Sequence, residues 1–157
     1  MPLVSMTLSP RADQVRTARM VAATAARRSG VAEELLDDVR LAVAEACSRA
    51  VRRHAAAGST DLVELTFTDD VNTFSVAVID HAGPTPVSPG GLDGDDREPG
   101  ALDGDDREPG GDDAGFDLDD PDALSLALIA GLIPSHQVAA GPTAGSTQVT
   151  MTWPLST

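Results

Sequence analysis

The chain has 157 residues, of which 41% are hydrophobic, and a formal net charge of −14. A chain of this size and composition can bury one hydrophobic core, so we expect a single domain over residues 1–157. The first ten residues lack the basic and then apolar order of a signal peptide, and no stretch is apolar for long enough to cross a bilayer. We therefore expect a soluble, cytoplasmic protein with no membrane partner.

The charge is unevenly distributed along the chain. All 11 basic residues are arginine, and between Met1 and His54 nine of them against six acidic residues leave a net charge of +3. Between His81 and Asp120, thirteen acidic residues against two arginines leave −11. A chain with this overall charge is not expected to bind nucleic acid directly.

The single cysteine, Cys47, excludes an intramolecular disulfide and a metal site built from several cysteines. It falls on an apolar helical stripe, which indicates a buried thiol rather than a reactive one. The aspartate-rich stretches lack the spacing of a calcium-binding loop, and the three histidines lie near no serine or cysteine in a recognisable catalytic signature. We therefore expect no metal site.

The sequence of the first half of the chain predicts one strand and two helices. Alternating residues over 3–8 predict a short edge strand. A stripe of small apolar residues predicts a helix over 11–29, which ends at Gly30. Residues 31–54 form the second predicted helix, with an apolar stripe at Val39, Val43, Ala46 and Ala50.

Glu45 and Arg49 lie one helical turn apart on a face next to this stripe. Two interpretations stay open. The pair could be an ordinary i,i+4 ion pair on the surface of the helix, worth a few tenths of a kcal/mol. Alternatively, the two charged groups line the wall of a pocket.

The second half of the chain contains four strands, one helix and an acidic insertion. Alternation predicts strands over 61–68 and 71–80, joined by a hairpin turn at 69–72. Residues 124–132 predict a short buried helix that starts after Asp120-Pro121-Asp122, and two closing strands follow over 135–140 and 146–153. Residues 82–120 are acidic and contain a nine-residue duplication, 92–100 and 102–110, which predicts a flexible lid insertion.

This order of elements resembles the anti-sigma factor serine-protein kinases of bacterial stress-response and sporulation switches, which are members of the GHKL ATPase superfamily. The sequence resemblance is best over residues 38–48, 78–80, 126–129 and 145–149. It implies a two-layer α/β sandwich, in which helices cover a mixed, mainly antiparallel sheet of the Bergerat type. It also implies a helix motif Glu-x-x-x-Asn, in which Glu is the general base and Asn holds a magnesium ion.

The resemblance places the catalytic carboxylate at Glu45. It places nucleotide contacts at Asp80, Gly83, Arg49, Gly145 and Thr147. The pattern is broken at Arg49, which stands at the position of the magnesium-binding Asn, because a guanidinium has no lone pair to give to a metal ion. The family's glycines are also missing at Ala82, Pro84 and in 123–126. The kinase activity is therefore expected to be lost or severely weakened, with at most weak ATP binding without the usual magnesium site.

Relatives use an arginine on the first helix to bind both the sigma factor and the antagonist that releases it. The resemblance places this arginine at Arg19, and Arg16 lies one turn earlier. The alternative that both are ordinary surface residues stays open. The expected partners are a sigma factor and/or an anti-sigma antagonist, and a second copy of the chain is a further alternative.

Three functions remain open from the sequence. The first is an anti-sigma-factor-like regulator of a partner-switching pathway with a degenerate nucleotide pocket. The second is an active ATP-dependent serine-protein kinase, in which Arg49 contacts a phosphate directly in place of the metal. In the third, the acidic insertion is a binding module for a basic partner.

Overall fold

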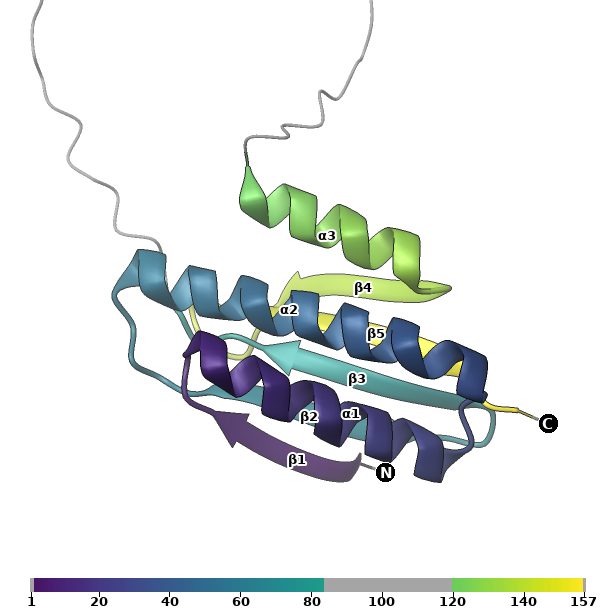
Figure 1. Cartoon of the computed structure of the whole chain (residues 1–157). Helices are drawn as coiled ribbons and strands as arrows, with labels where there is room; N and C mark the ends of the chain where they lie inside the picture. The colour runs from purple at the N-terminus through teal and green to yellow at the C-terminus, as the bar shows by residue number, and fades with distance from the viewer. Residues whose placement is uncertain (1, 84–119, 157) are drawn as a thin grey trace, which may run out of the picture.

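A computed structural model describes residues 2–83 and 120–156 of the chain (Figure 1). Five strands form one sheet in the order β1-β2-β3-β5-β4. The strands are β1 (Pro2–Leu8), β2 (Val63–Asp69), β3 (Thr73–Ile79), β4 (Ser135–Ala140) and β5 (Thr147–Pro154). The predicted acidic insertion over 82–120, with its duplication, lies outside the described residues except for residues 82, 83 and 120.

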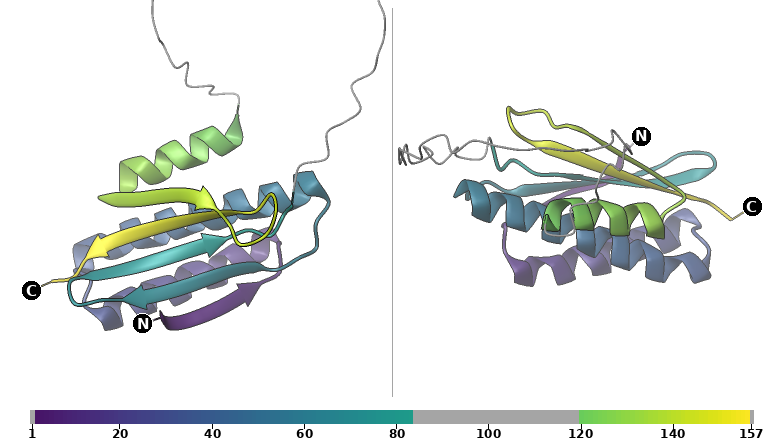
Figure 2. Two further views of the ribbon diagram at one scale, coloured as in Figure 1. Left: turned by 180° about the vertical axis from the view of Figure 1, so that it is seen from behind. Right: turned by 90° about the horizontal axis from the view of Figure 1, so that it is seen from above.

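Three α-helices pack on the sheet: α1 (Val15–Ser29), α2 (Leu36–Ala57) and α3 (Pro121–Leu132). Short 3-10 turns, Ala12–Gln14 and Glu33–Leu35, precede α1 and α2. Seen from above in Figure 2, the helices all lie on one side of the sheet. This confirms the predicted two-layer α/β sandwich. The described strands pair antiparallel throughout, so the mixed character expected of the sheet is absent from them.

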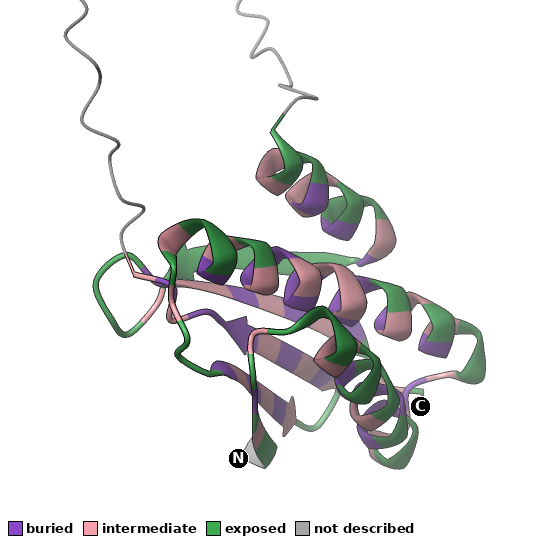
Figure 3. Cartoon of the chain, turned by 60° about the vertical axis from the view of Figure 1, so that its left-hand side comes forward, coloured by how far each residue is buried: buried purple, intermediate pink, exposed green. Residues whose placement is uncertain are grey.

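The core lies between the sheet and the helices, as the burial colours of Figure 3 show. In β2 and β3 every second residue is buried and the alternate ones are only partly covered, as the predicted alternation requires. The predicted stripe of α2 is confirmed, because Val39, Val43, Ala46 and Ala50 are all buried against the sheet layer. In α1 the buried residues are all alanine, and their small side chains allow α1 to pack closely against α2.

The second helix starts later than predicted. Val31 pairs with Leu155 in an isolated antiparallel bridge, so the chain is extended at this point, and α2 begins only at Leu36. The end predicted at Gly30 for the first helix is confirmed. Gly30 has a φ of 98°, a left-handed conformation that glycine adopts without steric cost.

The prediction of a buried third helix is wrong. Only Ser125 and Ile129 of α3 are buried, while Leu124 and Leu128 are 39% and 48% exposed. The hydropathy of the segment suggested a core helix, but α3 lies at the margin of the helical layer, beside α2 and the edge strand β4 (Figure 1). No helix within residues 2–83 and 120–156 has the length and apolarity to cross a membrane.

Cys47 is expected to be chemically inert in the folded protein. It is buried, and burial raises the pKa of its thiol to about 12, so the reactive thiolate is almost absent. A thiol-specific reagent such as DTNB at about pH 8 should therefore label the native chain only as fast as it unfolds. The same reagent should label the chain fully in concentrated guanidinium chloride. Rapid labelling of the native chain would contradict a buried thiol.

Candidate functional site

Polar side chains gather where β3 ends and β5 begins. Asp80 directly follows β3, and Thr147 is the first residue of β5. The two strands pair antiparallel with Ile79 opposite Gln148, which brings Asp80 and Thr147 together. The Asp80 amide donates to the Thr147 carbonyl at 3.0 Å, and the Thr147 hydroxyl donates to Oδ2 of Asp80.

Two arginines of α2, one helical turn apart, reach these residues from the helical layer. Arg53 donates from Nε to Oδ2 of Asp80 at 3.0 Å and from Nη2 to the Gly145 carbonyl at 3.0 Å. Arg49 donates from Nη1 to the Thr147 hydroxyl at 3.0 Å, and the same nitrogen lies 3.9 Å from Oδ2 of Asp80. The side chains of Arg49 and Asp80 are only 5% and 1% exposed, so their charges compensate each other away from water.

Both oxygens of the Asp80 carboxylate accept hydrogen bonds from the chain itself. Its Oδ2 accepts hydrogen bonds from Arg53 and Thr147, and its Oδ1 accepts one from the Ala82 amide at 3.3 Å. These three bonds leave about one of the four acceptor sites of the carboxylate for a ligand donor.

The third helix adds a second carboxylate to the cluster. Asp122, in the first turn of α3, accepts from Nη2 of Arg49 at 2.9 Å, and its other oxygen lies 2.8 Å from Nε of Arg49. Nη1 of Arg53 lies 3.8 Å from Oδ2 of Asp122. Arg49 therefore lies between the start of α3 and the start of β5 and connects them. We call Arg49, Arg53, Asp80, Asp122 and Thr147 the buried ion cluster.

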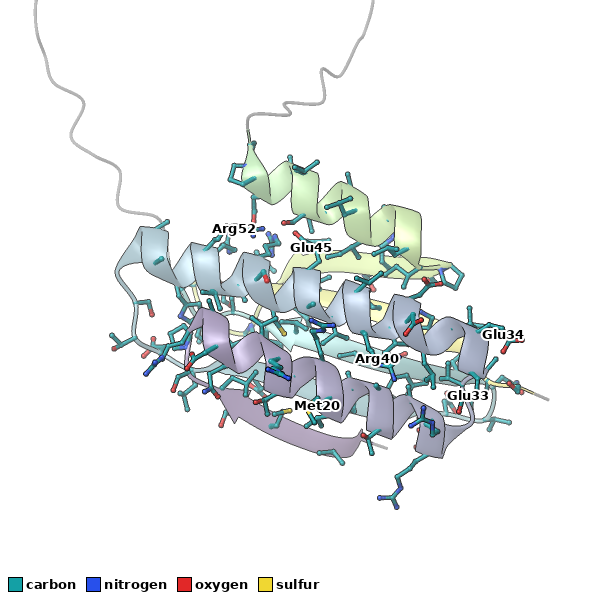
Figure 4. All side chains as sticks on the ribbon, viewed as in Figure 1. Met20, Glu33, Glu34, Arg40, Glu45 and Arg52 are labelled. Atoms are coloured by element: carbon teal, nitrogen blue, oxygen red, sulfur yellow. The ribbon has the colours of Figure 1, made fainter. Side chains whose placement is uncertain are left out.

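Glu45 belongs to a neighbouring polar group. Its carboxylate accepts a hydrogen bond from the Ser125 hydroxyl of α3 and lies 3.6 Å from Nη2 of Arg52, which also donates to Ser125. In Figure 4 the labelled Glu45 and Arg52 both extend from α2 toward α3. The interpretation of Glu45 and Arg49 as an i,i+4 ion pair is therefore wrong, because Arg49 pairs with Asp122 instead.

Most residues predicted to contact a nucleotide come together at this site. Asp80, Arg49 and Thr147 belong to the buried ion cluster, and the carbonyl of Gly145 accepts from it. Gly83 lies beside the cluster, in a hollow that it shares with Arg52, Arg53 and Asp122. Glu45 lies outside the cluster and contacts α3 through Ser125.

The predicted docking arginines lie in a different region of the molecule. Arg16 and Arg19 are exposed on α1, where they line a shallow hollow with Val15, Met20 and Arg40 of α2. Within residues 2–83 and 120–156, no carboxylate lies within 4.0 Å of either Arg16 or Arg19. Both guanidinium groups are thus accessible to a partner.

Sequence reasoning missed the roles of Arg53 and Asp122. Arg53 lies four residues after Arg49, so the i,i+4 spacing alone could have placed both on one helical face. From the sequence, Asp122 is predicted only to lie at the start of a helix. Nothing in the sequence links it to Arg49, 73 residues away. Ser125 was missed for the same reason.

His54 follows Arg53 on α2, and its burial leads us to expect a loss of stability in acid. Its side chain is buried, Nε2 accepts a hydrogen bond from the His81 amide at 3.1 Å, and Nδ1 has no partner in the described parts of the chain. Burial lowers the pKa of His54, against the opposing effect of Asp80 and Asp61, while His81 and Arg53 lower it further.

The unfolded chain therefore binds a proton at His54 more readily than the folded chain does. We expect the free energy of unfolding to fall as the pH drops below about 6.5, the ordinary value for histidine, and to level off below the folded pKa. Urea unfolding at several pH values checks this, with His54→Gln as the control that should flatten this part of the profile. An equal slope in both proteins would contradict the assignment to His54.

Comparison with known families agrees with the fold. The family model of the histidine kinase-like ATPase domain matches residues 8–153, which is nearly the whole chain. Among curated proteins, none matches the chain significantly. The family match supports the GHKL superfamily that the sequence resemblance implied. The chain therefore belongs to the histidine kinase-like ATPase domain family.

Proposed function

We propose that the chain is an anti-sigma-factor-like regulator in a cytoplasmic partner-switching pathway. It binds a sigma factor and/or an anti-sigma antagonist through the arginines of α1, and its nucleotide pocket no longer binds Mg-ATP in the manner of its relatives. The observation that carries this proposal is the buried ion cluster, in which Arg49 stands at the magnesium-binding position and pairs with Asp122.

The residues present do not fit a magnesium ion. Arg49 brings a positive charge and only hydrogen-bond donors to the position where the family has an asparagine oxygen. Within the described parts of the chain, no group of three histidine, cysteine, aspartate or glutamate side chains could hold a metal ion. Loss of the metal would remove the bridge between the helix and the nucleotide phosphates.

The adenine contact expected of Asp80 also meets competition from the chain. Both oxygens of this carboxylate already accept hydrogen bonds from Arg53, Thr147 and the Ala82 amide. An adenine amino group would have to use the one acceptor site that these bonds leave, or replace one of the donors. ATP is therefore at most a weak ligand under this proposal.

The alternative of an active serine-protein kinase rests on Glu45, Asp80 and Thr147, which stand at the family's functional positions. Isothermal titration of the wild-type chain with ATP and magnesium separates the two functions. Micromolar binding that disappears on addition of EDTA would refute the degenerate pocket and favour the kinase. No heat of binding, or equal weak binding with and without EDTA, is the expected result.

The docking role of Arg19 is tested by charge reversal. Arg19→Glu should reduce capture of the sigma factor or antagonist from the native host at least about tenfold, because it replaces an attractive charge with a repulsive one. The matched control is Arg28→Glu, the same change on the same helix. Arg28 lies nine residues further along α1 and so projects from its opposite side. Equal loss in both variants would contradict a specific role for Arg19.

The acidic insertion offers a third function that the same assay can test. Deletion of residues 91–110 removes the duplicated acidic sequence and leaves every described residue in place. Under our proposal the deletion leaves partner capture unchanged. Loss of capture in the deletion variant, with normal capture by Arg19→Glu, would instead favour the insertion as the binding module. Size-exclusion chromatography of the same proteins would show whether a homodimer forms.

A further inference from the structure

We propose that Arg49 and Arg53 form a binding site for a phosphate-type anion that requires no metal ion, and that Asp122 occupies this site as an internal competitor. The inference builds on the proposed function, because it concerns the same pocket and depends on the loss of the magnesium site. It assigns to the pocket a ligand class, the free phosphate or polyphosphate group.

The geometry of Arg49 is that of an arginine that binds an oxyanion. Its Nη2 donates to one oxygen of Asp122 at 2.9 Å, and its Nε lies 2.8 Å from the other oxygen, so the edge of the guanidinium that can bind carboxylates and phosphates faces this carboxylate with one of the two hydrogen bonds formed. Arg53 approaches the same carboxylate, with Nη1 at 3.8 Å from Oδ2. Two guanidinium groups thus converge on one anionic position.

The Asp122 carboxylate does not satisfy all the buried hydrogen-bond donors of Arg49. Nε of Arg49 is buried and forms no hydrogen bond with any residue that the structure describes, because its N–H is not directed at the Asp122 oxygen 2.8 Å away. A buried donor without an acceptor is costly, and a tetrahedral phosphate offers oxygens in more directions than a planar carboxylate does. The orphaned Nε is therefore a specific sign that a different anion would fit better.

The competing carboxylate can leave without disruption of the core. Asp122 is 31% exposed and lies in the first turn of α3, whereas Arg49 is 5% exposed. The hollow lined by Arg52, Arg53, Gly83 and Asp122 gives solvent access to it. The partial positive charge at the N-terminus of α3 adds little here, because the carboxylate of Asp120 already caps this turn by accepting from the Asp122 amide at 2.9 Å.

The neighbouring carboxylates have other partners, and Asp120, which lines the same hollow, accepts from the Asp122 amide. Asp80 keeps its own donors, Arg53, Thr147 and the Ala82 amide, when Asp122 moves away. Glu45 is held by Ser125 and Arg52. When Asp122 moves away, Arg49 loses its nearest carboxylate, so Arg49 is the cation that an incoming anion would neutralise.

The test is binding of inorganic pyrophosphate in EDTA to Asp122→Asn, which keeps the size of the side chain and removes its charge. We expect calorimetry to show at least about tenfold tighter binding than to the wild-type chain, and weaker binding as the salt concentration rises. The matched control is Asp37→Asn, an exposed aspartate of α2 that pairs with Arg40, and it should bind like the wild type. Equal affinity in the two variants would overturn the proposal.

Two further measurements complete the test. The double variant Asp122→Asn/Arg53→Gln should lose most of the gain, and retention of the full gain would overturn the assignment of Arg53. ATP in EDTA should bind Asp122→Asn about as tightly as pyrophosphate if only the polyphosphate group is recognised. Much tighter binding of ATP would mean that the nucleoside is recognised too and would overturn an anion-only site.

If Asp122→Asn does not fold, the melting temperature of the wild-type chain is measured instead. Millimolar pyrophosphate in EDTA should then raise its melting temperature more than that of Arg53→Gln, and equal shifts would overturn the proposal. These results are distinct from a failure of the proposed function, which would appear as magnesium-dependent ATP binding by the wild-type chain. Pyrophosphate binding without metal leaves the regulator role intact.

Discussion

Replacement of Arg49 with alanine is expected to lower the free energy of unfolding by about 3–5 kcal/mol, the range observed when one partner of a buried ion pair is removed. The guanidinium of Arg49 is almost completely buried and contacts Asp122, Thr147 and Asp80. Its loss leaves Asp122 with only the distant Arg53 and leaves an empty volume between α2 and α3. Urea unfolding followed by circular dichroism measures the effect.

The matched control for Arg49 is another arginine of the same helix. Arg40 pairs with Asp37, but the side chains of this pair are 34% and 85% exposed. Because water screens such a pair, Arg40→Ala should cost no more than about 1 kcal/mol. Equal losses for the two substitutions would contradict a larger contribution of the buried Arg49 to stability.

A double substitution separates loss of the charge from loss of the contact. Arg49→Met fills much of the same volume, and its combination with Asp122→Leu removes the positive charge together with its nearest negative partner. Since apolar replacement of a whole buried pair is often neutral, the double variant should be more stable than Arg49→Met alone. A double variant less stable than Arg49→Met would show that Asp122 stabilises the chain without Arg49.

The layers of the fold could be predicted from sequence because their signals are local. Alternation in residues 61–68 and 71–80 and the stripe of Val39, Val43 and Ala46 each require only neighbouring residues to be compared. The burial of these residues follows directly from such periods. The same local reasoning failed for α3, because the hydropathy of 124–132 does not say whether a helix lies at the centre or at the margin of a layer.

The candidate site could be located from sequence but its contacts could not. The family motif placed Arg49, Asp80 and Thr147 near each other, and the structure brings them together. The choice of partner depends on tertiary packing: Arg49 turns away from Glu45, four residues before it, and takes Asp122, which is 73 residues away in the sequence. A periodic pattern contains no information about a contact of this kind.

Replacement of Trp153 with alanine should lower the free energy of unfolding by about 3–5 kcal/mol, because the substitution removes a large side chain that the surrounding layers cannot refill. Trp153 is 0% exposed, and its ring lies 6.3 Å from that of Phe74. Its Nε1 is buried and has no hydrogen-bond partner among residues 2–83 and 120–156. Trp153→Phe therefore removes an unsatisfied donor while it keeps an aromatic ring, and it should cost less than about 1.5 kcal/mol. Val71→Ala, at an 86% exposed position, should change stability by less than about 0.5 kcal/mol. Circular dichroism in urea measures all three, and similar losses for the phenylalanine and alanine variants would show that the indole packing, rather than the aromatic volume, stabilises this end of the core.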